Sequence, residues 1–188
     1  MDAYQNIYSE ISKVVEVSPT DWEEFKSYWT PVTLAKGELF VEQGEASEYA
    51  GFLVKGFVSN DYITSGGKEI IKLFQFENSF IGSLAALNGG VSHHCVKAME
   101  ESHILKARTK DIFGLINTKP IWETLIRKMV EKAFFEKQEK EHELMTFSAK
   151  ERYHSLKDSL GENIDRISKK DISLYLGIDP ATLSRLLK

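Results

Sequence analysis

The chain has 188 residues, of which 42% are hydrophobic and 28% are charged, and its formal net charge is −4. These values suit an ordinary globular protein with one large or two small domains. No apolar run approaches the roughly 20 residues that a membrane span needs, and the polar N-terminus lacks the pattern of a signal peptide. We therefore expect a cytoplasmic protein without a membrane partner.

Cysteine and histidine content argues against a metal centre. The one cysteine, Cys95, excludes an internal disulfide and a zinc site built from cysteines of one chain. It is interpreted as a buried strand residue. The neighbouring His93 and His94 are interpreted as part of a polar turn between strands, because no third ligand lies at a useful spacing. We predict no metal and no cofactor.

Charge is distributed unevenly along the chain. Residues 150–188 carry a net charge of +2, whereas residues 1–149 carry −6. The overall acidity argues weakly against a nucleic-acid partner. However, salt screens charges over about 10 Å at 0.1 M ionic strength, so a basic face can act independently of a distant acidic body. The pattern predicts an acidic body with a mildly basic tail.

The first 29 residues have helical periodicity. Ile7, Ile11, Val14 and Val15 fall on one face of a first helix. The Ser18-Pro19 pair then predicts the start of a second helix, because serine is a good N-cap and proline fits the first helical turn.

From Pro31 the period changes to that of short strands. Glycine-containing turns separate many of these apolar runs, and such spacing is typical of a sandwich or barrel. The seven predicted strands cover residues 32–35, 38–41, 49–54, 57–63, 69–76, 94–99 and 103–108.

The pattern is helical again from Asp111, and a long helix is predicted to start near Pro120. Its first half has an apolar stripe and its second half is charged on all sides. A helix of this kind favours a partner helix, most simply from a second copy of the chain, although packing against the β-rich domain is an alternative. The predicted dimer interface consists of Trp122, Leu125, Ile126, Met129, Val130, Ala133 and Phe134.

The last 22 residues predict two short helices joined by a tight turn. Ser168 is a good N-cap with Asp171 three residues on, and Gly177 is placed to end the first helix. Asp179 and Pro180 then start the second helix, whose Leu183, Leu186 and Leu187 are expected to point inward. Two helices in this arrangement form a helix-turn-helix unit, which can place its second helix in a DNA major groove.

A plain helical corner is the alternative interpretation of this pair. The outward face of the second helix favours DNA binding, because it combines arginine, lysine and small hydroxyl residues without an acid after Asp179. Small side chains allow close approach to the groove, and arginine can reach guanine N7 and O6. The predicted DNA-binding residues are Lys169, Lys170, Pro180, Ala181, Thr182, Ser184, Arg185 and Lys188.

Taken in order, five segments of the sequence resemble the Crp/Fnr family of regulators: residues 34–45, 49–58, 66–84, 92–115 and 169–188. The resemblance implies an α+β fold with a double-stranded β-helix, or jelly-roll, domain of the cyclic-nucleotide-binding type. It implies a domain at 1–117 that includes the N-terminal helices, a long dimerisation helix at 118–147 and a helix-turn-helix domain at 148–188. No wing is expected after the recognition helix within these residues. Family members are dimeric transcription regulators, so DNA, a second copy, RNA polymerase and a small-molecule effector are the implied partners.

Two departures from the family pattern affect the implied effector pocket, which comprises Ile81, Gly82, Ser83, Leu84, Ser92, His93 and His94. Ser83 replaces the glutamate that holds ribose hydroxyls in cyclic-nucleotide binders of the family. The segment 91–95 contains no arginine, although a buried cyclic phosphate needs a compensating cation or several N–H donors. We therefore do not expect cAMP to bind in the usual way.

Other functions receive less support from the sequence. It contains no glycine-rich phosphate loop, no HExxH motif and no nucleophile elbow, so no catalytic residues and no enzymatic activity are predicted. A ligand-binding or scaffold module of the same fold that has lost sequence-specific DNA binding is the alternative to a transcription regulator.

Overall fold

The computed structural model describes residues 2–187. Its centre is a sandwich of two four-stranded antiparallel sheets, with strand orders β1-β8-β3-β6 and β2-β7-β4-β5, called here the first and the second sheet. The strands are β1 (Thr30–Leu34), β2 (Leu39–Val41), β3 (Tyr49–Lys55), β4 (Val58–Ile63), β5 (Glu69–Gln75), β6 (Ser79–Ile81), β7 (Cys95–Ala98) and β8 (Ser102–Arg108).

The interior of the sandwich is filled by side chains from both sheets. Successive residues of a strand point to opposite faces, so Leu53 and Ile104 face inward while their neighbours Phe52 and Leu105 face outward. The inner core consists of Val41, Leu53, Val58, Ile81, Val96 and Ile104. Both outer faces are also apolar, and each is covered by helices.

Four helices cover the outer face of the first sheet: α1 (Ala3–Ser12), α2 (Pro19–Ser27), α3 (Thr109–Gly114) and the start of α4 (Pro120–Thr146). Ser18 caps α2 as predicted, since its hydroxyl accepts a hydrogen bond from the Asp21 amide over 3.2 Å. The α1 helix ends at Ser12, so Val14 and Val15 lie beyond it rather than on its face. At this end of the molecule Trp122 stacks on Phe25, with ring centroids 5.0 Å apart.

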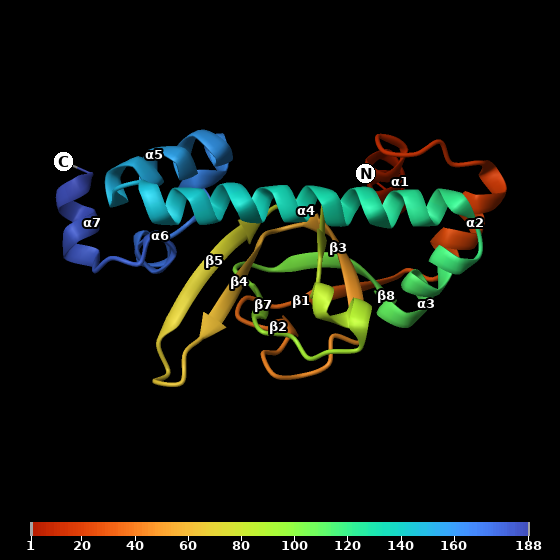
Figure 1. Ribbon diagram of the computed structural model, residues 1–188, viewed down its shortest axis with the longest axis horizontal. Coiled ribbons are helices and arrows are strands. Elements are labelled where there is room, and N and C mark those ends of the chain that lie inside the picture. Colours follow the sequence, from red (N-terminus) through yellow and green to blue (C-terminus); the bar gives the residue numbers. More distant parts are fainter. Residues whose placement is uncertain (1, 188) are drawn as a thin grey trace.

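The C-terminal helices cover the outer face of the second sheet. They are α5 (Ala149–Leu160), the 3-10 helix η3 (Gly161–Arg166), α6 (Lys169–Leu176) and α7 (Pro180–Leu186), and together they are called here the C-terminal unit. Figure 1 shows α4 running along the molecule with α1 and α2 at one end and the C-terminal unit at the other. Besides the inner core and the core over the first sheet, a third core lies between the second sheet and the C-terminal unit. It joins Phe57, Ile71 and Phe74 of the sheet region to six residues of the unit: Leu156, Ile164, Ile167, Ile172, Leu176 and Leu183.

All seven predicted strands are present, each within a few residues of its expected bounds. Among the strands and α-helices, β6 and α5 were not predicted, and neither were the 3-10 helices. The β6 strand has only three residues and follows Asn78, whose φ of 66° interrupts the extended pattern. The α5 helix begins at a capping box formed by Ser148 and Glu151. Within residues 2–187, none of the helices is long and apolar enough to cross a membrane.

Candidate nucleic-acid interface and effector pocket

Local sequence signals explain the geometry of the α6–α7 pair. The Ser168 hydroxyl accepts from the Asp171 amide over 3.1 Å and caps α6, while Gly177 ends the helix with a φ of 69°. Asp179 caps α7 by accepting from the Thr182 amide over 2.9 Å, and Pro180 occupies the first helical position. The predicted caps and turn are therefore in place. Asp171 bonds the Ser168 hydroxyl rather than its amide, so the capping box is half formed.

Most predicted contact residues on α7 lie on its exposed face. Pro180, Ala181, Ser184 and Arg185 are exposed and Thr182 is half-buried. Leu183 points inward as expected, with 1% of its surface exposed. The inward prediction for Leu187 is wrong, because its side chain is 36% exposed where α7 ends. The predicted contact Lys188 lies outside the described residues.

The two lysines at the start of α6 differ in their surroundings. Lys169 and Lys170 are both exposed. Lys170, however, lies close enough to Glu69 of β5 to help lower the pKa of that carboxyl, although the main cause is the hydrogen bond from Lys97. Glu69 is itself paired with Lys97, and neither Lys169 nor Lys170 makes an ion pair within the described part of the chain.

The predicted effector residues do not all face one cavity. Ile81 is buried in the inner core, and the Ser83 hydroxyl caps the 3-10 helix η1 (Leu84–Asn88) by accepting from the Ala85 amide. Ser92 is buried and donates from its hydroxyl to the His94 carbonyl oxygen over 2.7 Å. Leu84 and His93 are exposed. Of the seven, Ser92 and His94 are joined, since the His94 amide also donates to Ser92 Oγ over 3.3 Å. The Gly82 backbone lies near enough to the His94 imidazole to influence its pKa.

A basic group, which the sequence did not single out, lies beside His94. Burial and then the neighbouring Lys72 lower the pKa of His94, so its imidazole is neutral at pH 7. The Tyr62 ring lies 6.2 Å from the His94 ring, and the Lys72 Nζ lies 6.0 Å from the Tyr62 ring centroid. Burial and Lys137 of α4 lower the pKa of Lys72. Lys72 forms no ion pair with any residue from 2 to 187.

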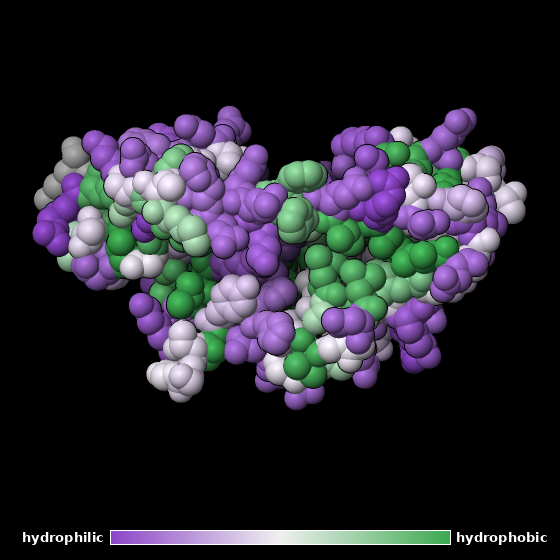
Figure 2. Space-filling view, in the orientation of Figure 1, coloured by the Kyte–Doolittle hydropathy of each residue, from purple (hydrophilic) through white to green (hydrophobic). Residues whose placement is uncertain are grey.

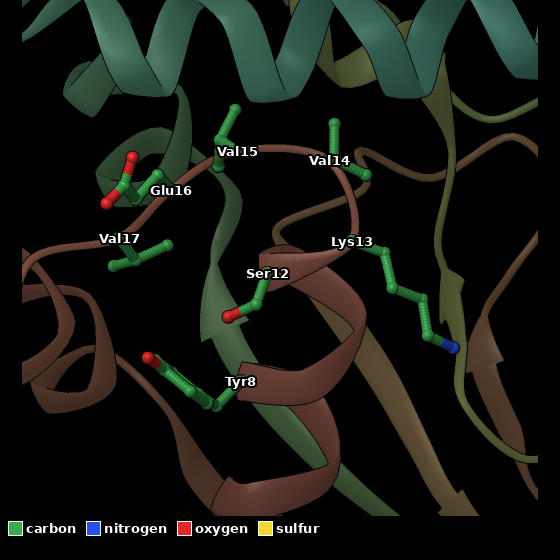
Figure 3. A pocket seen from close by; sticks show the side chains of 7 residues that line it. All are labelled: Tyr8, Ser12, Lys13, Val14, Val15, Glu16 and Val17. Atoms are coloured by element: carbon green, nitrogen blue, oxygen red, sulfur yellow. The ribbon is translucent and has the colours of Figure 1, made fainter.

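Two surface hollows are lined by other residues. The larger, about 430 Å³, is lined by Tyr8 and by the segment from Ser12 to Val17 that joins α1 to α2. In Figure 3, Val14 and Val15 point toward α4 while Lys13 points away from it. The second hollow, about 340 Å³, lies against the back of η1 and includes Ala46, Gly90 and Arg108. Neither hollow is lined by the predicted effector residues.

The apolar stripe of α4 has a buried part and a more exposed part. Trp122 and Leu125 are 1% and 3% exposed inside the core over the first sheet, and this corrects their assignment to a dimer interface. Ile126 and Met129 pack partly on the same core, and Val130 and Ala133 are half-buried. Phe134 is 56% exposed and Phe135 is 61% exposed. Figure 2 shows apolar side chains protruding from the surface near the middle of α4. The apolar surface left free on α4 therefore begins beyond Leu125.

Comparisons with known proteins agree with this architecture. Residues 31–119 match the family described as Cyclic nucleotide-binding domain. No curated protein matches the sequence. A putative Crp/Fnr-family transcriptional regulator from Eubacterium rectale has a similar structure, with a TM-score of 0.74 and 13% identity over 99% of this chain and 86% of that one.

Two further solved structures have the same fold. The c-di-GMP responsive global regulator CLP of Xanthomonas campestris has a TM-score of 0.72 and 13% identity, over 88% of this chain and 87% of that one. FixK2 of Bradyrhizobium japonicum has a TM-score of 0.69 and 22% identity, over 85% and 82%. The chain thus has an α+β fold, with a β-sandwich of the cyclic-nucleotide-binding type followed by a long helix, and it is similar at low identity to Crp/Fnr regulators.

Proposed function

We propose that the protein is a homodimeric, DNA-binding transcription regulator of the Crp/Fnr type, without enzymatic activity. The observation that carries this proposal is the exposed face of α7. It presents Ala181, Ser184 and Arg185 to solvent, while Leu183 on the opposite side fixes the helix to the third core. A helix that is packed through its buried face and carries small and cationic side chains on its exposed face is suited to insertion into a major groove.

The charge distribution supports DNA binding by the C-terminal residues, although the chain as a whole is acidic. The C-terminal residues 150–188 are net basic although the chain is acidic, so the favourable field is local. Few phosphate contacts are offered by one copy, since Lys169 and Lys170 are the two lysines at the start of α6. We therefore propose that two copies bind a near-palindromic site and that affinity depends strongly on dimerisation.

The dimer is proposed to form along α4 beyond the part that is buried in its own core. Val130, Ala133 and Phe134 are the members of the predicted interface that remain accessible, with Ile126 and Met129 at its edge. Phe135 adds exposed apolar surface beside them. Contiguous exposed apolar surface of this kind is typical of protein-protein contacts, in which aromatic residues are enriched.

The effector is proposed to differ from cAMP bound in the usual manner. Ser83 uses its hydroxyl to cap η1 and carries no carboxylate for ribose hydroxyls. His94 is neutral at pH 7 because burial lowers its pKa, so it does not replace the missing arginine as a cation. RNA polymerase remains a proposed partner of the DNA-bound dimer.

Selection of bound sequences from random duplex DNA, with and without a cell extract of small molecules, tests the function. The proposal expects recovery of a two-fold symmetric motif whose half-sites are about one helical turn apart. Binding to the selected duplex should weaken steeply as salt rises. Recovery of no motif under either condition would favour the scaffold alternative, in which the fold is kept and sequence-specific DNA binding is lost.

A further inference from the structure

Arg166 connects the C-terminal unit to the β domain. Its guanidinium donates two parallel hydrogen bonds to Glu77, from Nη2 to Oε1 over 2.8 Å and from Nη1 to Oε2 over 2.9 Å. Nη2 also donates to Glu100 Oε1 over 2.5 Å, and Nη1 to Asn163 Oδ1 over 3.0 Å. Bidentate arginine-carboxylate pairs fix orientation as well as distance, because the guanidinium and the carboxylate are both planar.

Aromatic rings hold the same guanidinium from the side. Phe57 and Phe76 stack with ring centroids 5.0 Å apart. The Arg166 guanidinium carbon lies 5.2 Å from the centroid of Phe57 and 5.1 Å from that of Phe76. Contacts of this kind favour arginine over lysine, since a planar guanidinium can stack on aromatic rings. Arg166 therefore meets two acids and two rings of the β domain at once.

The acceptor for Arg166 is preformed within the β domain. Glu77 Oε1 also accepts the Gly56 amide over 2.9 Å. Gly56 has a φ of 94°, and a Cβ there would lie 2.4 Å from Ser102 Oγ, so the backbone at this point tolerates little change. Burial opposes ionisation of Glu77, but the bonds from Arg166 and from the backbone outweigh it and lower the pKa of the carboxyl. Glu77 therefore stays ionised whenever the protein is near neutral pH.

Arg166 lies close in sequence to the α6–α7 pair, so its contact with the β domain can affect the orientation of that pair. It is the last residue of η3 and stands two positions before Ser168, the N-cap of α6. The chain connects the C-terminal unit to α4 through Phe147 and Ser148, which are both extended. The unit supplies six of the nine buried residues of the third core, so it has apolar contacts of its own. The unit also contacts α4 directly, since Ser155 Oγ donates to Glu143 and the Lys140 Nζ lies 4.3 Å from the Tyr175 ring. Among its contacts with the β domain, the bidentate pair of Arg166 is the most directional.

We propose that Arg166 is the positioning residue of the α6–α7 pair. By fixing the unit on Glu77 and Glu100, it sets the angle between α7 and α4, and hence the separation of the two α7 helices in a dimer. This inference rests on the proposed function. It predicts that Arg166 determines which half-site spacing is bound, without touching DNA itself.

The test compares the parent with Arg166→Gln on duplexes carrying the selected half-sites at several spacings. The parent should bind one spacing much more tightly than duplexes with one base pair added or removed. Arg166→Gln should bind several spacings with similar affinity, since its α7 helices are no longer held at one separation. Arg166→Lys should fall between them, because it keeps the charge and loses the bidentate bond. A sharp, unchanged spacing preference in Arg166→Gln would overturn the inference.

A distance measurement tests, without DNA, whether Arg166 fixes the C-terminal unit relative to the β domain. Nitroxide labels on Ser65→Cys, at the exposed β4–β5 turn, and on Ser184→Cys of α7 span the two parts, and the native Cys95 is buried. Labelled chains are diluted with unlabelled ones so that one pair is measured per dimer. The distance distribution should be narrow in the parent and broad in Arg166→Gln, and equal widths would overturn the inference. Failure of the parent to bind any DNA would instead count against the proposed function.

Arg127→Gln provides a matched control for both measurements. Arg127 donates to Glu131 over 2.5 Å within α4, so the same substitution there removes an ion pair that does not join two parts. Folding of the body is checked by tryptophan fluorescence, because all three tryptophans belong to the core over the first sheet. Arg127→Gln should retain the parent's spacing preference and distance distribution.

Discussion

Arg185 Nη2 donates a hydrogen bond to Thr182 Oγ1 over 3.0 Å on the exposed face of α7, so the two predicted base-contacting residues are linked before any DNA is present. Thr182 in turn donates to the capping carboxylate of Asp179 over 2.6 Å. Such prior ordering lowers the entropy lost when Arg185 meets a base. If Arg185 reads guanine, Arg185→Ala should cost about 1–3 kcal/mol of binding free energy and relax preference at one position per half-site.

Gel shifts on the selected duplex and on single-base variants of it measure this effect. Arg108→Ala is the control, because Arg108 is an exposed arginine at the end of β8 in the β domain. The control should bind like the parent. If Arg185→Ala also binds like the parent and keeps the parent's base preference, the proposal that Arg185 of α7 contacts a base is wrong.

The lysines of α6 are predicted to act on phosphates rather than bases. Lys169→Ala should weaken binding to all sequences alike and reduce the slope of log K against log salt by about one. Lys170→Ala should reduce the slope less, since Lys170 lies near Glu69, whose pKa it helps to lower. Filter binding over a salt series gives both slopes. Lys110→Ala, at an exposed lysine of α3, is the control, and an effect of similar size there would contradict the assignment.

The sequence predicted the local structure well because caps, turns and periodicity are local signals. Ser168, Gly177 and Asp179 each do in the structure what their position indicated. Contacts between distant segments were not predictable in the same way. Arg166 and Glu77 are 89 residues apart and carry no motif, so only the folded chain reveals that they meet. For the same reason the stripe of α4 could not be divided into its buried part and its exposed part.

Leu183 and Leu187 lie four residues apart at the end of the chain and should respond very differently to substitution. Leu183 is 1% exposed in the third core, so Leu183→Ala should destabilise by about 2–5 kcal/mol. Leu187 is 36% exposed, and Leu187→Ala should change stability by about 0.5 kcal/mol or less. Thermal unfolding followed by far-ultraviolet circular dichroism compares the two variants.

Tryptophan fluorescence locates the damage, because Trp22, Trp29 and Trp122 all belong to the core at the opposite end of α4. In Leu183→Ala the loss of helix should precede the change in fluorescence. Equal stability of the two leucine variants would mean that α7 is not anchored through Leu183.

Phe134 is expected to be a main contact of the dimer. It is 56% exposed in one copy and lies on the same stripe as Val130. Phe134→Glu should dissociate the dimer at micromolar concentration, because it places a charge in an apolar contact. Phe135→Glu makes the same chemical change on a side of α4 rotated by about 100°, and it should weaken the dimer less. Sedimentation velocity measures both, and a Phe134→Glu variant that remains dimeric would place the interface elsewhere.

The last prediction concerns cAMP, which should bind no more tightly than millimolar. A cyclic phosphate leaves water only if cations or N–H donors replace its hydration. Here Ser83 offers a hydroxyl already engaged in capping η1, and His94 is neutral because burial and Lys72 lower its pKa.

Lys72, beside His94, is a cation that could still attract the phosphate, since it forms no ion pair with residues 2–187. Isothermal calorimetry is therefore run on the parent and on Lys72→Met, which keeps most of the length of the side chain and removes its charge. Both should give no measurable heat at micromolar cAMP. Micromolar binding of cAMP by the parent would contradict the prediction. If Lys72→Met abolished that binding, Lys72 would be the cation that replaces the missing arginine.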